Sequence, residues 1–385
     1  MRYSGFRAGA RSDRWLLFLA VLVLVVFFAS CFLLVSNYKH FGNLVKVISL
    51  VRNHYLQPVA ASTLVDGAIK GIVNSLDDPY SVYLEPRTFN QLQEVIKGSF
   101  GGVGVLVGLK DQYIGVVRVF RGTPAAKAGI ITGDVITSID DRDVRGIDLE
   151  TAVQLMRGPV GSKVMLGIKR EGVSELLKLP LTREEISVPT VESRVVPGTG
   201  IGYVVISQFA EKTAGELREA LESLRAAGIK GLILDLRDNP GGELKAAVEV
   251  SKFFIPKGPI VYIDFRVGRD EAFYSDGNAL RLPLVVLIND NSASAAEILA
   301  GAVKDTGAGT LVGTKTFGKG VVQTVFPLDN GAALKLTTAR YLTPSRNDIN
   351  EKGILPDVVV QQPADRAEDV QMQKALEIMK GKVKG

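Results

Sequence analysis

The segment LPLVVLINDNSASAAEILAGAV, residues 282–303, decides the fold of this chain. Residues 282–288 form a continuous apolar run of strand length, and the small and apolar residues from 295 to 303 are typical of a buried helix. The polar loop between them delivers Ser294 to the first turn of that helix. A buried strand that feeds a helix through a short loop predicts an α/β core, in which helices cover a sheet.

Alternating strands and helices are also predicted upstream of this segment. Residues 201–206 and 231–236 are expected to be strands, and residues 213–227 a helix that begins with the capping-box pattern Thr213-x-x-Glu216. A PGG turn at residues 240–242 then leads into another helix. We therefore expect one α/β core over residues 186–365 and a C-terminal helix over residues 366–385.

Ser294 is placed where a nucleophile would be useful, and a lysine is the best candidate for its base. A serine nucleophile needs a neighbouring group that takes its proton. The chain has only two histidines, His40 and His54, both far from Ser294 in sequence. Lys319, in TFGKGVVQ (316–323), is the alternative, because burial lowers the pKa of a lysine. The short strings alone also fit a small helix-start residue and a solvated lysine in a glycine-rich turn.

Two backbone N–H groups are needed to stabilise the oxyanion of a tetrahedral intermediate. The N–H of Ala295 is one candidate, because it lies at the helix N-terminus, where negative charge is favoured. The second is expected from Gly241 or Gly242 in DLRDNPGG (235–242), where no Cβ would obstruct a substrate. The sequence does not decide between the two glycines, and a turn that needs glycine only for its geometry is an equal alternative.

Residues 98–185 differ in character from the core. Residues 103–107 and 114–119 are predicted to be paired strands, and Thr123 with Pro124 begins a short helix as its N-cap and first residue. A strand after Gly133, an amphipathic helix over residues 148–157 and a strand over residues 164–170 follow. This order, together with GTPAAKAGI, GDVI and SID, resembles a PDZ domain.

From about residue 45 to residue 360 the chain resembles the C-terminal processing peptidases, also called tail-specific proteases. The resemblance rests on motifs that occur in one order around the PDZ-like segment: SLDDPYSVYL (75–84), DLRDNPGG (235–242), NSASAAEILAGAVKD (291–305), LVGTKTFGKGVVQ (311–323) and KGILPDV (352–358). It implies a serine endopeptidase with a spiral α/β core of the ClpP and crotonase type, interrupted by an inserted PDZ domain.

The resemblance also implies roles for individual residues. Ser294, rather than Ser292, matches the nucleophile, Lys319 matches the base, and Gln323 matches a residue that supports the lysine. The oxyanion donors match Ala295 and one of the two glycines named above. On an extended strand, residues 319 and 323 would lie roughly 13 Å apart. A direct bond between them requires a bent or helical segment.

The PDZ-like segment is expected to bind peptide C-termini. A PDZ domain adds an extended peptide to a sheet edge and holds its carboxylate with backbone N–H groups of a loop. The candidate loop covers residues 100–105, and the candidate groove lies between residues 103–107 and 148–157. The expected binding residues are Gly102, Val103, Gly104, Val105 and Val153, with Val107, Leu149 and Met156 also facing inward. These residues predict a preference for apolar C-termini, unless they only form the core of the small domain.

The N-terminal end predicts a membrane anchor. Residues 15–36 contain no charged side chain, and roughly 20 such residues span a hydrocarbon core. Four arginines in residues 1–14 place that end in the cytoplasm by the positive-inside rule. We expect one transmembrane helix and an extracytoplasmic catalytic domain at the cell membrane. A cleaved signal peptide and a lipoprotein signal ending at Cys31 are the alternatives.

Residues 40–97 are predicted to be helical, either as a dimerisation arm or tether or as a layer on the core, and we expect a homo-oligomer, with a dimer favoured. The net charge of +5 is concentrated at the two ends, which argues against nucleic-acid binding. One cysteine and two histidines make a metal improbable, and no cofactor is expected. An inactive membrane-tethered PDZ scaffold and a crotonase-like acyl-CoA enzyme are the competing functions.

Overall fold

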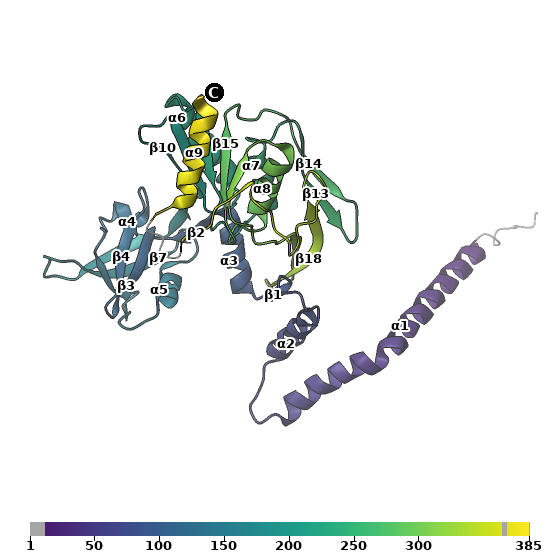
Figure 1. Ribbon diagram of the computed structural model, residues 1–385. Coiled ribbons are helices and arrows are strands. Elements are labelled where there is room, and N and C mark those ends of the chain that lie inside the picture. The colour runs from purple at the N-terminus through teal and green to yellow at the C-terminus, as the bar shows by residue number, and fades with distance from the viewer. Residues whose placement is uncertain (1–11, 364–367, 385) are drawn as a thin grey trace, which may run out of the picture. The chain divides into compact units, whose positions relative to one another are not determined.

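The computed structural model describes residues 12–363 and 368–384, and the chain divides into two compact units on either side of residue 78 (Figure 1). The first unit contains the helices α1 (Ser12–His54) and α2 (Ala61–Asn74). Among the residues whose side chains are described, no helix has the length and hydrophobicity that a membrane span requires. Of the predicted N-terminal segments, residues 1–11 and the side chains of residues 12–14, 16–17 and 29–40 lie outside that set.

The second unit is built on a six-stranded sheet with the order β10-β11-β12-β15-β16-β19. The strands are β10 (Val191–Val196), β11 (Ile201–Ile206), β12 (Gly231–Asp235), β15 (Leu284–Ile288), β16 (Thr310–Gly313) and β19 (Val358–Val359). All neighbours are parallel except the edge strand β10. The carboxyl ends of the parallel strands therefore meet at one edge, where ligands and catalytic loops usually lie in such sheets.

Helices cover both faces of this sheet, as the apolar runs in its strands require. Leu232 and Leu234 of β12 pack with α6 (Thr213–Ala226), α7 (Leu244–Ser251) and α8 (Ala295–Thr306). Ile233, on the opposite face, packs with α9 (Val370–Lys384). The yellow C-terminal helix in Figure 1 is α9, and it lies against the sheet away from α7 and α8.

A second sheet closes the core on the far side of α8. It consists of β1 (Val82–Leu84), β13 (Gly258–Phe265), β14 (Glu271–Ser275), β17 (Val321–Pro327) and β18 (Ala333–Leu342). All of its pairings are antiparallel, and its buried side chains join the same hydrophobic cluster as α7 and α8. Strand β1 precedes the PDZ-like segment in sequence, whereas β13 to β18 follow it, so that segment is an insertion into the core.

The inserted domain has a six-stranded sheet and a hydrophobic core of its own. Its elements are β3 (Val105–Lys110), β4 (Tyr113–Val119), α4 (Pro124–Lys127), β5 (Val135–Ile139), β6 (Arg142–Asp143), α5 (Leu149–Met156), β7 (Lys163–Lys169) and β8 (Leu177–Thr182). The helix α3 (Pro86–Lys97) precedes it. The strands β2 (Ser99–Gly102) and β9 (Glu184–Ser187) pair with each other and bring both ends of the insertion together.

Three local expectations are wrong. The capping box at the start of α6 does not form, because the Glu216 carboxylate instead accepts the N–H of Thr190 at 2.7 Å and so ties α6 to the start of β10. The predicted carboxylate loop begins as strand β2, since residues 100–102 pair with β9. The region 40–97 contains the short strand β1, which tertiary pairing with β18 stabilises.

Candidate active site

Ser294 occupies a strained turn between β15 and α8. It is the N-cap of α8, with φ of 53° and ψ of −114°, a conformation that is rare for a residue with a Cβ. Such strain persists only where the surroundings hold it, and it occurs at catalytic nucleophiles on similar strand-to-helix turns. Here the backbone N–H of Ser294 donates to Glu297 Oε2 at 2.8 Å, which fixes the turn from within the helix.

The carboxylate of Glu297 joins the loop of Ser294 to the loop of Lys319. Glu297 is fully buried on the first turn of α8. Its oxygens accept the Ser294 N–H, the Thr316 hydroxyl at 2.6 Å, the Gly318 N–H at 2.7 Å and the Lys319 N–H at 2.8 Å. Four donors to one carboxylate satisfy its hydrogen-bonding capacity, so the buried charge stabilises this arrangement. Glu297 is not among the site residues predicted from the sequence, although Ser294-x-x-Glu297 is itself a capping-box pattern.

Tyr341 and Tyr80 contact the same lysine from two further elements. The Tyr341 hydroxyl, at the end of β18, lies within hydrogen-bond reach of the carbonyl oxygens of Ser294 and Lys319. Burial, and next the charge of Glu297, raise the pKa of Tyr341 well above its usual value, so the hydroxyl remains a neutral donor. The Nζ of Lys319 lies 4.5 Å from the centre of the Tyr80 ring.

The DLRDNPGG loop comes against Ser294 through Gly241. A Cβ on Gly241 would lie 2.8 Å from the Ser294 Cβ and 2.9 Å from the Ala295 nitrogen, so only glycine allows this approach. The fully buried Asn239 sets the loop: its Oδ1 accepts the Gly241 N–H at 2.8 Å, and its Nδ2 donates to the Ile206 carbonyl at 2.7 Å. The N–H of Gly241 is therefore already engaged.

Gly242 differs from Gly241 in the state of its N–H group. Gly242 lies opposite Phe209 in an isolated parallel β-bridge, whose two hydrogen bonds are made by the neighbours of Gly242. The Glu243 N–H donates to the Phe209 carbonyl, and the Phe209 N–H donates to the Gly241 carbonyl. Among the described residues, neither the Gly242 N–H nor the Ala295 N–H has an acceptor within the protein. Of the three predicted oxyanion donors, these two N–H groups are therefore available to donate a hydrogen bond to a ligand.

Gln323 lies in β17, where the pairing with β18 shifts register between Val322 and Gln323. The segment is thus extended with a bulge, and it does not form the helical turn that the sequence left open. The Gln323 side-chain amide donates to the Thr337 hydroxyl at 3.2 Å. Through this bond the residue is tied to β18, and its role toward Lys319 stays a prediction.

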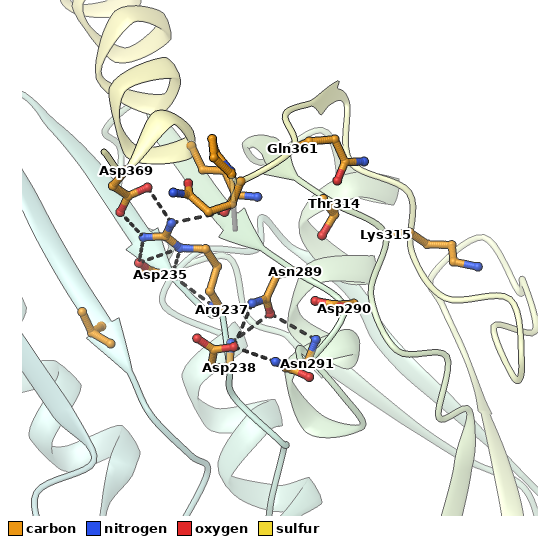
Figure 2. Close-up of a pocket in the computed structure, with 14 residues that line it drawn as sticks. Asp235, Arg237, Asp238, Asn289, Asp290, Asn291, Thr314, Lys315, Gln361 and Asp369 are labelled. Carbon is orange, nitrogen blue, oxygen red and sulfur yellow. Dashed lines mark hydrogen bonds and ion pairs between the residues drawn. The ribbon is translucent and has the colours of Figure 1, made fainter. Parts of the chain in front are cut away.

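A polar cavity of about 940 Å³ adjoins the loops of Gly241 and Ser294 (Figure 2). In it the Arg237 guanidinium is held between Asp235, at 2.7 Å, and Asp369, at 2.8 Å. Burial lowers the pKa of Arg237, but the two carboxylates outweigh burial and raise it above its ordinary value. The ion pairs fix the N-terminal end of α9 to the loop that follows β12.

Residues that line the same cavity join the loops of Gly241 and Ser294. The Asp238 carboxylate accepts the side-chain N–H groups of Asn289 at 2.9 Å and Asn291 at 2.8 Å (Figure 2). The Asn289 side chain in turn accepts the Asp238 N–H at 2.9 Å. These bonds bridge the loop after β12 and the loop after β15, which hold Gly241 and Ser294 respectively. No role for these side chains is predicted from the sequence, because Asp238 is 51 residues from Asn289 and 53 residues from Asn291.

The predicted peptide-binding residues lie where β2 leads into β3 and on the helix α5. Gly102 ends β2, Val105 begins β3, and Val103 and Gly104 lie between these strands, while Val153 lies on α5. Val105, Leu149 and Val153 are only partly buried and can line a groove between β3 and α5. Val103, Val107 and Met156 belong to the buried core of the domain, so packing explains these three apolar side chains.

Family models match three parts of the chain. The model of peptidase family S41 matches residues 200–360, and the PDZ domain model matches residues 115–170. A third model, described as the N-terminal domain of the activating protease CtpB, matches residues 34–88. These three models match the α/β core, the inserted domain and the N-terminal region, respectively.

Similar proteins include the carboxy-terminal processing protease CtpA of Bacillus subtilis, 41% identical over 325 residues that cover 84% of this chain and 69% of that protein. The carboxy-terminal-processing protease of Bartonella bacilliformis is 41% identical over 336 residues, 85% of this chain and 76% of that protein. Among solved structures, the photosystem II D1 C-terminal processing protease has 32% identity and a TM-score of 0.51, and the match covers 85% of this chain and 88% of that one.

Proposed function

This chain belongs to peptidase family S41, among the C-terminal processing serine peptidases that carry a PDZ domain, and from that membership we propose how its own residues act. Ser294 is the nucleophile, and Lys319 is the base that takes its proton. The observation that carries this proposal is Glu297, which accepts the backbone N–H groups of both residues and so holds their loops together.

The proposed reaction follows the chemistry of acyl transfer. The neutral amine of Lys319 takes the hydroxyl proton of Ser294 as Oγ attacks the scissile carbonyl carbon. The lysine then gives that proton to the leaving amine, and the acyl-enzyme remains. Water hydrolyses the acyl-enzyme by the same route, with Lys319 again accepting a proton. Gln323 is proposed to support the lysine from β17.

We assign the oxyanion donors to Ala295 and Gly242. Both N–H groups lack an acceptor among the described residues, whereas Asn239 engages the N–H of Gly241. The proposed role of Gly241 is steric: because it has no Cβ, its backbone can lie against Ser294, which brings the following peptide unit close to the serine. Donors already in place when charge develops on the substrate oxygen stabilise it without reorganisation.

The dyad is tested by Ser294→Ala, Lys319→Ala and the double variant. Each single change should abolish peptide hydrolysis without unfolding the chain, and the double variant should be little worse, because the two groups act as a unit. Replacing both His40 and His54 should leave the rate nearly unchanged. Substantial hydrolysis by the Lys319→Ala protein would show that another group is the base.

The PDZ domain is proposed to bind apolar C-termini of substrates. The partly buried Val105, Leu149 and Val153 would receive the last side chain, and the N–H groups around Gly102–Gly104 would receive the carboxylate. Rates should be compared for one peptide with a free carboxylate, an amidated end or a terminal Asp. Equal rates for all three would remove the domain from substrate selection.

The N-terminal region is proposed to hold the enzyme at a membrane. Its support is the sequence: residues 15–36 are uncharged, and four arginines precede them. The catalytic unit would then lie outside the cytoplasm, and a dimer is the proposed assembly. Sequencing the mature N-terminus after membrane fractionation tests the anchor. A terminus at or beyond residue 31 would contradict it, and acylated Cys31 would favour a lipoprotein.

A further inference from the structure

The side chain of Lys319 lies against an aromatic ring from a distant part of the sequence. Its Nζ is 4.5 Å from the centre of the Tyr80 ring, within the range at which the face of a ring attracts a cation. Both residues are half-buried, which reduces competition from water. The ring therefore favours the ammonium form of the lysine over the neutral amine.

The second sheet holds Tyr80 in place. The next residue, Ser81, is buried, and its hydroxyl accepts the Thr337 N–H at 3.0 Å. Strand β1 then pairs with β18 along its whole length. Strand β18 also carries Tyr341, whose hydroxyl contacts the Lys319 carbonyl. The backbone of Lys319 is thus contacted from β18, and its side chain is contacted from the turn that precedes β1, the neighbour of β18.

We propose that Tyr80 is a positioning residue that holds the Lys319 side chain in its ammonium form and so sets the pH at which the base becomes available. The inference rests on the proposed role of Lys319 as the base. Two further ionisable groups contact the backbone of this lysine: Glu297 of α8 accepts its N–H, and the Tyr341 hydroxyl of β18 bonds to its carbonyl. The Glu297 carboxylate also favours the ammonium form, and the ring of Tyr80 adds to that effect.

The consequence for activity has a definite sign. A lysine acts as a base only after it has lost its proton. A contact that stabilises the ammonium form therefore raises the pH at which hydrolysis begins. Weakening the contact without changing the shape of the ring should make the enzyme active at lower pH.

The test is a series of phenylalanines at position 80, introduced into the full chain by nonsense suppression. Phenylalanine is the reference, and one, two and three ring fluorines withdraw electron density from the ring face while nearly preserving its size. The acid limb of kcat/KM for an unstructured peptide should move to lower pH with each fluorine, by about 0.5–1 pH unit in total. An acid limb that stays in place across the series would overturn the proposal. If the ring only fills space, its electron density has no effect on the pH dependence of hydrolysis.

Two controls separate the possible failures. The same series at Tyr274, an exposed residue of β14, should not move the acid limb. Lys319→Ala tests the underlying function: if this variant keeps its activity, the assignment of the base is wrong. If Lys319→Ala is inactive while the fluorinated series leaves the acid limb unmoved, the dyad stands and only the role of Tyr80 is wrong.

Discussion

At the scale of single residues, buried polar side chains fix the loops that carry Ser294 and Lys319, the proposed reacting groups, which are themselves only partly buried. Glu297 and Asn239 are both fully buried, and each bonds to backbone groups of a catalytic loop. A buried polar group with all its partners rigidifies its surroundings, whereas one that loses a partner is costly. Substitutions at these two positions should therefore change catalysis without touching the substrate.

Glu297→Gln should impair both stability and turnover. The amide nitrogen would replace one carboxylate oxygen, so two of the four N–H or O–H donors would face another donor. The expected cost is about 1–3 kcal/mol of the free energy of unfolding, with a fall in kcat because the loops of Ser294 and Lys319 separate. Thermal unfolding and peptide kinetics measure these effects, and Glu222→Gln on the exposed side of α6 is the matched control. Unchanged kcat would mean that Glu297 does not align the dyad.

Asn239→Ala should reduce kcat far more than it changes KM. The substitution releases the Gly241 N–H and leaves the buried Ile206 carbonyl without its donor, so the neighbouring Gly242 N–H loses its fixed direction. Loss of one oxyanion donor typically lowers kcat by about 10²–10³-fold. Steady-state kinetics test this, with Asn278→Ala at an exposed position as control. A change confined to KM would point to substrate binding instead.

At the scale of elements, each loop that carries a functional residue follows a strand of the parallel sheet. The strained turn at Ser294 follows β15, and the glycine loop follows β12, its parallel neighbour. The glycine-rich loop of Lys319 follows β16 in the same sheet. Because carboxyl ends of parallel strands meet at one edge, loops far apart in sequence converge. In the inserted domain the strands are antiparallel, and an ion pair between the buried Asp134 and the partly exposed Arg170 secures the ends of β5 and β7.

Asp134→Asn should destabilise the inserted domain near neutral pH and less so in acid. Burial would raise the pKa of Asp134, but bonds from Arg170 and the Ile131 N–H outweigh burial and hold it below its ordinary value of about 3.9. A carboxyl with a depressed pKa stabilises the folded state fully above that ordinary value, and the contribution is lost as pH falls through the folded pKa.

The measurement is hydrogen exchange of β5 and β7 in the full chain between about pH 5 and pH 3. The difference in protection between Asp134→Asn and the unmodified chain should shrink toward the acid end. Asp141→Asn, at a largely exposed ion pair with Lys178, is the control and should show little effect at any pH. A constant difference across the range would show that the charge of Asp134 is not responsible.

At the scale of the whole molecule, the PDZ domain is an insertion closed by its own pair of strands. Gly102 and Glu184 are partners in the β2–β9 ladder, so the chain leaves and re-enters the core at adjacent positions. The core sheets and the inserted domain have separate hydrophobic clusters. Folding of the protease core should therefore not require the insertion.

Replacing residues 103–183 by Asn-Gly tests this organisation. A two-residue turn of this composition suits an antiparallel pair at the spacing of Gly102 and Glu184. The shortened chain should keep a cooperative thermal unfolding transition, and it should hydrolyse a free and an amidated peptide at equal rates. Retained discrimination between the two peptides would place recognition of the C-terminus in the core. A chain that cannot fold would show that the core depends on the insertion.

The sequence by itself determined the alternation of strands and helices over residues 201–303 and the inserted domain, and it supplied the proposed site residues. Apolar runs such as residues 282–288 are buried on both faces of a sheet whatever their partners, and Ser294 directly follows one of them. The strings around Ser294 and Lys319 are local, so their identity needed no contact information. Family membership followed from the same strings and agrees with the matches to family models.

Only the tertiary structure decided which groups meet. The proposed choice of Gly242 over Gly241 as oxyanion donor rests on Asn239, whose Oδ1 accepts the Gly241 N–H and whose Nδ2 bonds to a carbonyl 33 residues away. The capping box of α6 failed, and the loop at residues 100–102 became a strand, because β10 and β9 offered better partners than the local chain. Tyr80 reaches Lys319 only because β1 joins β18. Hydrogen bonds between distant segments leave no periodicity in a sequence, so burial and pairing in the folded molecule select them.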